Sequence, residues 1–336
     1  MRYIVALVIL VLLVSCGGSS STTTDSVDTT SQDTLDIKVF FSKTSGAYYD
    51  GGVDNVITQD IENAKSSIYM AMYDFTNSMI LDALIDAKKR GVDVEVTTDD
   101  ATIDEDNYQK LLDEGIRVSD DNNPNALMHD KFLLIDGTIL WSGSGNYTVY
   151  SFYRNNENYV RVESKDFANA YQKEFMLLSS NDDTSYKGVD IGDVDIYFSP
   201  DANFVSKIVE LIDNAKTSIY FLAFSFTNKD IADALIEAKK RGVDVKGVFD
   251  EGQNAQQTYS QYDYLLSSDI DVKLDGSSYK QHSKVIIIDN TITITGSYNF
   301  TKKANYTNNE NSLVIKSQDI AKEYKNNFDT AYSIAK

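Results

Sequence analysis

The chain has 336 residues, of which 42% are hydrophobic, and this size allows one large domain or two domains of ordinary size. Its formal net charge of -20 repels nucleic acid and anionic membranes at long range, although a local basic pocket remains possible. The single cysteine, Cys16, excludes an intrachain disulfide. One cysteine and two histidines also argue against a zinc site, so we expect no bound metal.

The N-terminus carries an apolar run, Ile4 to Val14, just after Arg2, and the run has the proportions of a signal peptide. The residues that end in Cys16 read Leu-Val-Ser-Cys, which resembles the bacterial lipobox, whose cysteine is acylated. We therefore expect a lipoprotein signal peptide over residues 1–16, lipidation at Cys16 and a lipid-anchored, extracytoplasmic place in a bacterial cell envelope. An ordinary signal or an uncleaved anchor with an incidental cysteine is the alternative.

The segment over residues 17–36 is rich in Ser, Thr, Gly and Asp, and this composition predicts a flexible linker. Patterns of strand and helix then alternate along the chain. The elements predicted for the first half are strands over 37–41 and 67–74, a helix over 78–90, a strand from 92 to 96, strands over 132–135 and 138–141, and a helix over 166–178.

The second half repeats the first. The segment Lys88–Val94 recurs unchanged as Lys239–Val245, and Asn63–Tyr69 is closely matched by Asn214–Tyr220, in both cases 151 residues later. So long a period indicates a duplicated domain rather than a solenoid. We predict an α/β fold of two tandem α-β-α sandwiches with mixed sheets, over 37–180 and 181–336, related by a pseudo-two-fold axis.

The only two histidines of the chain open the same pattern in the two repeats. The first repeat carries, in order, His129, Lys131, Asp136, Ser144, Asn146 and Glu157. The second repeat carries His282, Lys284, Asp289, Ser297, Asn299 and Glu310 at the same spacing.

These residue types suit phosphate chemistry. On a strand, alternation places His129 and Lys131 on one face, and likewise His282 and Lys284. Lysine, asparagine and serine side chains bind phosphate oxygens, and a glutamate orients an imidazole through its far nitrogen. Each half would thus supply one oriented histidine and part of an anion cradle. Because cleavage through a covalent intermediate needs a nucleophile and a separate acid, two facing halves would complete one site.

The double pattern resembles the phospholipase D superfamily, whose signature HxKxxxxDxxxxxxGSxN both repeats satisfy. The resemblance implies an active site between the halves, a phosphohistidine intermediate, and turnover without a metal or other cofactor. It suggests His129 as the nucleophile and His282 as the acid and base. We take the following as the candidate catalytic residues: His129, Lys131, Asp136, Asn146 and Glu157 in the first repeat, and His282, Lys284, Asp289, Asn299 and Glu310 in the second. Within this set, the resemblance implies that Asp136 and Asp289 mainly support the fold and the ion network around the site.

The expected function is a phospholipase D-like phosphodiesterase that hydrolyses phospholipid head-group esters. The lipid anchor would hold it at a membrane that contains its phospholipid substrate. Because one chain carries both half-sites, we expect a monomer. The alternatives are an endonuclease of the same superfamily, which the net charge disfavours, a phosphatidyl transferase of the cardiolipin-synthase type, and a lipoprotein that binds phosphorylated ligands without turnover.

Overall fold

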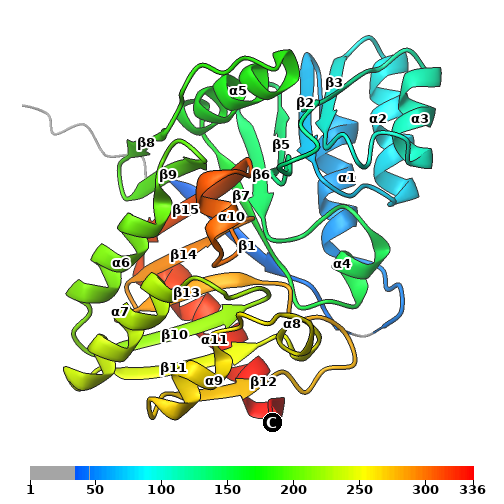
Figure 1. Cartoon of the computed structure of the whole chain (residues 1–336). Helices are drawn as coiled ribbons and strands as arrows, with labels where there is room; N and C mark the ends of the chain where they lie inside the picture. The colour runs from blue at the N-terminus through cyan, green and yellow to red at the C-terminus, as the bar shows by residue number, and fades with distance from the viewer. Residues whose placement is uncertain (1–34, 45) are drawn as a thin grey trace, which may run out of the picture. The chain divides into compact units, whose positions relative to one another are not determined.

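The structure, a computed structural model, describes residues 35–44 and 46–336 (Figure 1). The predicted signal peptide, Cys16 and all but the last two residues of the predicted linker lie outside the described residues. Residues from Leu35 to Lys336 form one compact unit that contains both repeats.

The first repeat contains a mixed sheet of seven strands. Its strand order is β1-β7-β6-β5-β2-β3-β4, in which β2, β3 and β4 are parallel and the other neighbours are antiparallel. The strands are β1 (Asp36–Phe41), β2 (Ser67–Met72), β3 (Asp93–Thr98), β4 (Arg117–Asp120), β5 (Lys131–Ile135), β6 (Ile139–Gly143) and β7 (Asn158–Glu163).

The second repeat builds a sheet in the same order, β9-β15-β14-β13-β10-β11-β12, and adds β8 beside β9. Two mixed sheets of matching topology confirm the predicted duplication and the α/β fold. The strands are β8 (Gly188–Ile191), β9 (Val194–Ser199), β10 (Ser218–Ala223), β11 (Asp244–Phe249), β12 (Asp271–Leu274), β13 (Lys284–Ile288), β14 (Ile292–Gly296) and β15 (Glu310–Lys316).

Each sheet has helices on both faces (Figure 1). The first repeat contains α1 (Val53–Asn63), α2 (Ser78–Lys89), α3 (Asp106–Asp113), α4 (Val149–Tyr153) and α5 (Lys165–Ser180). The second contains α6 (Phe204–Asn214), α7 (Lys229–Lys240), α8 (Glu251–Gln256), α9 (Tyr262–Ser267), α10 (Lys302–Tyr306) and α11 (Gln318–Ile334). No helix within the described residues is long and apolar enough to span a membrane.

The two repeats share a core. Alternation along β13 sends Ile286 and Ile288 into a core that belongs to the second repeat alone, under α6 and α7. Val285 and Ile287, which point the other way, join a core that also holds side chains of α5 and α11 and of the first sheet. This middle core, where β6 and β14 also contact each other, joins the two sandwiches, so the repeats are not independent domains.

Residues of the first repeat show the local signals that start and end its elements. Asn77 caps α2 through a side-chain oxygen that accepts from the Ile80 backbone N–H at 3.0 Å. Gly91 follows that helix with φ of +92°, a conformation that glycine adopts without steric cost. Asp136 and Gly137 form the tight turn between β5 and β6, both with positive φ.

Candidate active site

The two histidines lie just before β5 and β13, not within those strands as the alternation argument assumed. Each is held by a backbone hydrogen bond to the other repeat. The His129 N–H donates to the Asn309 carbonyl at 3.0 Å, and the His282 N–H donates to the Asn156 carbonyl at 3.1 Å. Residues 155–158 and 308–311 both read Asn-Asn-Glu-Asn, and the segment of each repeat therefore lies against the histidine segment of the other.

The same contacts between the repeats determine which glutamate lies beside which imidazole. Nδ1 of His129 lies 2.7 Å from Oε2 of Glu310 in hydrogen-bonding geometry. Nδ1 of His282 lies 2.8 Å from Oε1 of Glu157, although the angles are not those of a hydrogen bond. The expectation that each half orients its own histidine is therefore wrong. Both glutamates serve the opposite repeat, and both leave Nε2 as the ring nitrogen directed elsewhere.

Ser144 and Ser297 hold the glutamates, so their predicted role as phosphate ligands is not supported by their placement. The Ser144 hydroxyl donates to Oε2 of Glu157 at 2.7 Å, and that of Ser297 donates to Oε2 of Glu310 at 2.6 Å. Both serines are fully buried. A hydrogen-bond donor held in position stabilises the ionised form of a carboxylate. Each serine therefore affects a histidine only indirectly, because it holds the glutamate that faces that imidazole in its ionised form.

The two lysines are buried beside the histidines. Lys131 is 1% exposed and donates from Nζ to the His129 carbonyl at 2.8 Å, and Lys284 donates to the His282 carbonyl at 2.5 Å. Burial lowers the pKa of Lys131 to about 8 and that of Lys284 to about 7. Both glutamates oppose this shift by favouring the charged form. Each ammonium therefore titrates close to neutral pH.

Burial also lowers the pKa of both imidazoles, that of His282 to about 4. The glutamates and the lysines act on the imidazoles with opposite signs, but desolvation is the largest effect. Burial alone would raise the pKa of Glu157, yet His282 and Lys284 hold that pKa below its usual value. The empty site thus contains neutral imidazoles beside an ionised Glu157.

Asn146 and Asn299 line the same cavity as the two histidines, which has a volume of about 630 Å³. The side-chain oxygen of each asparagine has no hydrogen-bond partner among the residues that the structure describes. The structure therefore brings together His129, His282 and the two asparagines around one cavity, and each buried lysine donates to the backbone carbonyl of its histidine. This arrangement is what one site built from two half-sites requires.

Asp136 and Asp289 lie outside this cavity, at the far ends of β5 and β13 from the lysines. Asp136 accepts from the backbone N–H groups of Lys65, Ser66 and Ser67 at 2.7 to 3.1 Å. Asp289 makes the equivalent bonds in the second repeat. Their predicted support of the fold agrees with this geometry, whereas their predicted place among the catalytic residues and in an ion network around the site does not.

The sequence reading missed residues that shape the site. Tyr73 and Phe224, which are 151 positions apart, pack their rings against His129 and His282 at centroid distances of 5.3 and 4.4 Å. Asp99 accepts from the Met128 N–H, next to His129, at 2.8 Å, and Asp250 does the same for Gln281 at 3.0 Å. Each pair occupies matching positions in the repeats, which is the signal that could have found it.

Among the described residues, Asp99, Asp100 and Asp121 form a group whose carboxylate oxygens lie close enough to hold a metal ion. Two of these carboxylates already accept backbone N–H groups: Asp99 accepts from Ala101, and Asp121 accepts from Asp100, both at 3.0 Å. None of the three lines the histidine cavity.

A family model described as "Cardiolipin synthase, PLD-like domain" matches residues 57–178 and 208–332, one segment in each repeat and well over half the chain. The chain belongs to this family. The match confirms the resemblance to the phospholipase D superfamily, which rested on the duplicated His-x-Lys pattern.

Similar proteins include phospholipase D from Rickettsia conorii, which is 40% identical over 131 residues. That match spans 39% of this chain and 65% of the relative, so it covers less than two thirds of the relative's length. The mitochondrial cardiolipin hydrolase of Xenopus tropicalis is 33% identical over 124 residues, 37% of this chain and 59% of the relative. Phosphatidylserine synthase of Haemophilus influenzae covers 89% of this chain and 86% of its own, with a TM-score of 0.67 and 13% identity, which supports the fold alone.

Proposed function

We propose that the chain is a phospholipase D-like phosphodiesterase that hydrolyses phospholipid head-group esters through a phosphohistidine intermediate. One observation carries the proposal. His129 and His282 come from different repeats but line a single cavity, and Nδ1 of each faces a buried glutamate. Nε2 of each ring is then the nitrogen available to a phosphorus atom or to a leaving oxygen.

In the first step, Nε2 of His129 attacks the phosphorus atom and forms a P–N bond. The bond to the leaving alcohol breaks, and His282, in its protonated form, gives a proton to the alcohol oxygen. Glu310 stabilises the positive charge that develops on the His129 ring. An anionic phosphodiester in the cavity favours the imidazolium of His282 and so raises its pKa above the value of about 4 in the empty site.

In the second step, His282 takes a proton from a water molecule, whose oxygen attacks the phosphorus atom. The P–N bond breaks, His129 is restored, and the phosphate monoester leaves. Lys131 and Lys284 counter the negative charge on the phosphoryl oxygens in both transition states, and the amides of Asn146 and Asn299 add donors. An alcohol in place of water would give a new diester, which is the transferase alternative.

Two observations support a lipid substrate. The similar proteins include enzymes named phospholipase D and cardiolipin hydrolase. The formal net charge of -20 also opposes the long-range attraction on which polynucleotide binding depends. We propose in addition that acylated Cys16 tethers the protein to a bacterial envelope membrane, which would raise the effective concentration of a lipid substrate.

The test is a paired assay in excess EDTA. Protein that begins after Cys16 is offered mixed phospholipid vesicles in one reaction, and single-stranded and plasmid DNA in another. We expect release of free head groups and intact DNA. The double variant His129→Asn/His282→Asn should be inactive, with a circular dichroism spectrum that matches the wild type. Cleavage of DNA without head-group release would replace the lipid proposal with the nuclease alternative, and ligand binding without turnover of either substrate would favour the non-enzymatic alternative.

A further inference from the structure

Two cavities at matching places in the two repeats differ in charge. The first, which we call the acidic cavity, has a volume of about 240 Å³ and no basic side chain among the described residues that line it. It is lined by five carboxyl groups, those of Asp121, Glu174, Asp182, Asp183 and Asp201. The second, which we call the reference cavity, has a volume of about 450 Å³ and is lined by one carboxyl group, Asp275, and one ammonium group, Lys43.

The reference cavity shows how the same elements pack without the extra carboxyl groups. Ser199 is the last residue of β9 and lines the acidic cavity, and Ser42, just after β1, is its counterpart at the reference cavity. Glu174 of α5 also lines the acidic cavity, and 153 positions later α11 has an uncharged residue, Asn327, at the reference cavity. Substitutions at shared positions, and not a different fold, therefore make the first cavity acidic.

The carboxyl group of Glu174 is buried without a partner. The residue is 5% exposed, and its carboxyl group makes no hydrogen bond or ion pair with any residue of 35–44 or 46–336. Burial raises the pKa of Glu174 well above its usual value, and Asp130 and Asp201 raise it further. The ammonium group of Lys173 lies 4.0 Å from the centroid of the Tyr186 ring, and Lys173 does not line the acidic cavity. Because carboxylates buried this deeply are usually paired or bound to a metal ion, this environment favours a bound cation.

A hydroxyl group at the same cavity also lacks a partner. Ser199 is 3% exposed, and its Oγ has no hydrogen-bond partner in the described part of the chain. Its counterpart Ser42 donates from Oγ to the Asn155 carbonyl at 2.6 Å and accepts from the Glu157 N–H at 2.9 Å. Because buried hydroxyl groups are normally hydrogen-bonded, the unpaired Oγ of Ser199 indicates a ligand or an ordered water molecule at the acidic cavity.

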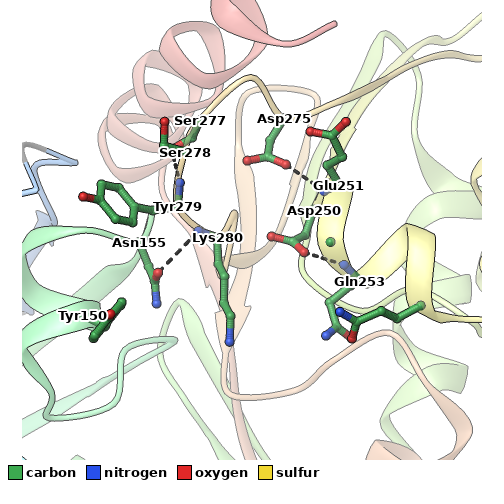
Figure 2. Close-up of a pocket in the computed structure, with 12 residues that line it drawn as sticks. Tyr150, Asn155, Asp250, Glu251, Gln253, Asp275, Ser277, Ser278, Tyr279 and Lys280 are labelled. Carbon is green, nitrogen blue, oxygen red and sulfur yellow. Dashed lines mark hydrogen bonds between the residues drawn. The ribbon is translucent and has the colours of Figure 1, made fainter.

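Asp121 adds a third oxygen atom without a partner. Its Oδ1 accepts from the Asp100 N–H at 3.0 Å, and its Oδ2 is buried and has no partner among the described residues. In the second repeat the counterpart Asp275 accepts from the Glu251 N–H at 2.7 Å, as Figure 2 shows, but neither of its oxygen atoms is both buried and unpaired. Both repeats thus use this carboxylate to hold a backbone N–H group, and the first also buries an unpaired oxygen atom beside its cavity.

We propose that the acidic cavity binds one calcium ion, which Asp121, Glu174 and Asp201 hold together with water molecules. Calcium takes about six to eight oxygen ligands in flexible geometry, and carboxylate, hydroxyl and water oxygens all serve, whereas magnesium requires a near-octahedral set. Unlike the group of Asp99, Asp100 and Asp121, the three proposed ligands are not close enough among the described residues to surround an ion by themselves. A volume of about 240 Å³ has room for the ion and for several water molecules that complete its ligand set.

The ion would join the two repeats. Glu174 belongs to α5 of the first repeat, and Asp201 follows β9 of the second. Asn309 also lines the acidic cavity, and its carbonyl accepts the His129 N–H at 3.0 Å. None of the three proposed ligands is among the described residues that line the histidine cavity. The ion would therefore stabilise the contact between the repeats without touching the reacting groups, which is compatible with turnover in EDTA.

The test measures calcium binding and thermal stability, neither of which depends on turnover. Protein that has been stripped of metal with EDTA and dialysed into chelator-free buffer is titrated with calcium chloride in a calorimeter. We expect one ion per chain with a Kd of about 0.1 mM or lower. Compared with the same protein in EDTA, about 10 mM calcium chloride should raise Tm by about 5 °C, and potassium chloride at the same ionic strength should not.

Variants locate the ion. Glu174→Gln should abolish the calcium-dependent rise in Tm, and Asp201→Asn should reduce it. The matched control Glu323→Gln removes an exposed carboxyl group of α11 that does not line the acidic cavity, and it should leave the rise unchanged. Each variant is compared with itself in EDTA, because Glu174→Gln also removes the repulsion between Glu174 and Asp130.

The outcomes separate a site from general screening of charge. A rise in Tm that is equal in all variants, or that potassium chloride reproduces, would reflect screening of the net charge of -20 and would overturn the site. Absence of calcium binding to the wild type would overturn it as well. If magnesium binds with the same Kd and gives the same Glu174-dependent rise, the assignment to calcium is overturned. If Glu174→Gln does not fold, the comparison of Asp201→Asn with Glu323→Gln decides between the site and screening.

Discussion

Nδ1 of His129 lies 2.7 Å from Oε2 of Glu310, although the two residues are 181 positions apart and belong to different repeats. The reverse pair, His282 and Glu157, lies at 2.8 Å. The crossing makes each half-site depend on the other repeat for the orientation of its imidazole. Each histidine therefore reaches its observed position only when two copies pack on each other, and this chain supplies both copies around one shared core.

Since each histidine is paired with the glutamate of the other repeat, we can predict which chemical step each glutamate supports. Glu310→Gln should impair the nucleophile His129, and Glu157→Gln should impair the acid His282, each lowering kcat on phospholipid by at least about 100-fold. The ester bis(p-nitrophenyl) phosphate has a leaving group that needs no acid. With it, Glu157→Gln should still release a rapid burst of p-nitrophenol, and Glu310→Gln should not. A burst from the Glu310 variant alone would reverse the assigned roles of the two histidines.

The lowered pKa of Lys284 leads us to expect weaker substrate binding at alkaline pH. Burial lowers its pKa to about 7, so the ammonium is charged below that pH and neutral above it in the empty enzyme. Since kcat/KM reports the ionisation of the free enzyme, kcat/KM should fall as pH rises through about 7, mainly through KM. Lys284→Ala should lower kcat/KM at every pH, by roughly 3 kcal/mol of transition-state stabilisation at about pH 6, and should flatten this decline. A wild-type KM that stays constant from about pH 6 to about pH 9 would contradict the titration of a phosphate-binding Lys284 in this range, and the effect of Lys284→Ala would then test the phosphate contact by itself.

We expect substitution of Asp136 to lower the stability of the fold and to leave catalysis unchanged. Its carboxylate accepts three backbone N–H groups at the start of β2, and Asn can replace only part of this set. Asp136→Asn should lower the free energy of unfolding by about 1 kcal/mol at neutral pH, measured by chemical denaturation. The matched variant Asp289→Asn should behave alike, because Asp289 makes the same bonds in the second repeat. A large fall in kcat of the folded variant would instead return Asp136 to the active site.

We expect substitution of Asp130 to increase the stability of the fold. This carboxyl group is fully buried, and neither oxygen has a hydrogen-bond partner within residues 35–44 and 46–336. Burial raises its pKa well above the usual value. A carboxyl group whose pKa is higher in the folded state than in the unfolded state has no effect on the free energy of unfolding at a pH below its unfolded-state pKa. It lowers that free energy progressively as the pH rises from there to its folded-state pKa. Asp130→Asn should therefore raise Tm by about 2 °C or more at pH 7 and leave it nearly unchanged at about pH 3.

The control for that prediction is Glu174, a buried carboxyl group whose pKa is raised by burial and by Asp130. Glu174→Gln should stabilise in the same direction, and the double variant should gain less than the sum, because each substitution relieves the other group. A lower Tm for Asp130→Asn at pH 7 would mean that the ionised carboxylate has a stabilising partner.

The sequence by itself determined the repeat, the α/β class, and the histidines, asparagines and glutamates that the site brings together. Local patterns suffice for these conclusions. The cap at Asn77, the turn at Asp136 and Gly137, and the alternation along β13 depend on neighbours within a few positions. The duplicated His-x-Lys pattern is visible in the sequence as two copies at a fixed offset.

Only the tertiary structure decided how the site residues pair. The spacing from His129 to Glu157 equals that from His282 to Glu310, so the sequence gives no reason to prefer pairing within a repeat or across the repeats. Packing of the two sheets on one middle core brings Glu310 to His129, turns Ser144 and Ser297 toward the glutamates, and leaves Asp136 at the far end of its strand. Contacts between segments more than 150 positions apart depend on the burial of the shared core, and no local pattern encodes that burial.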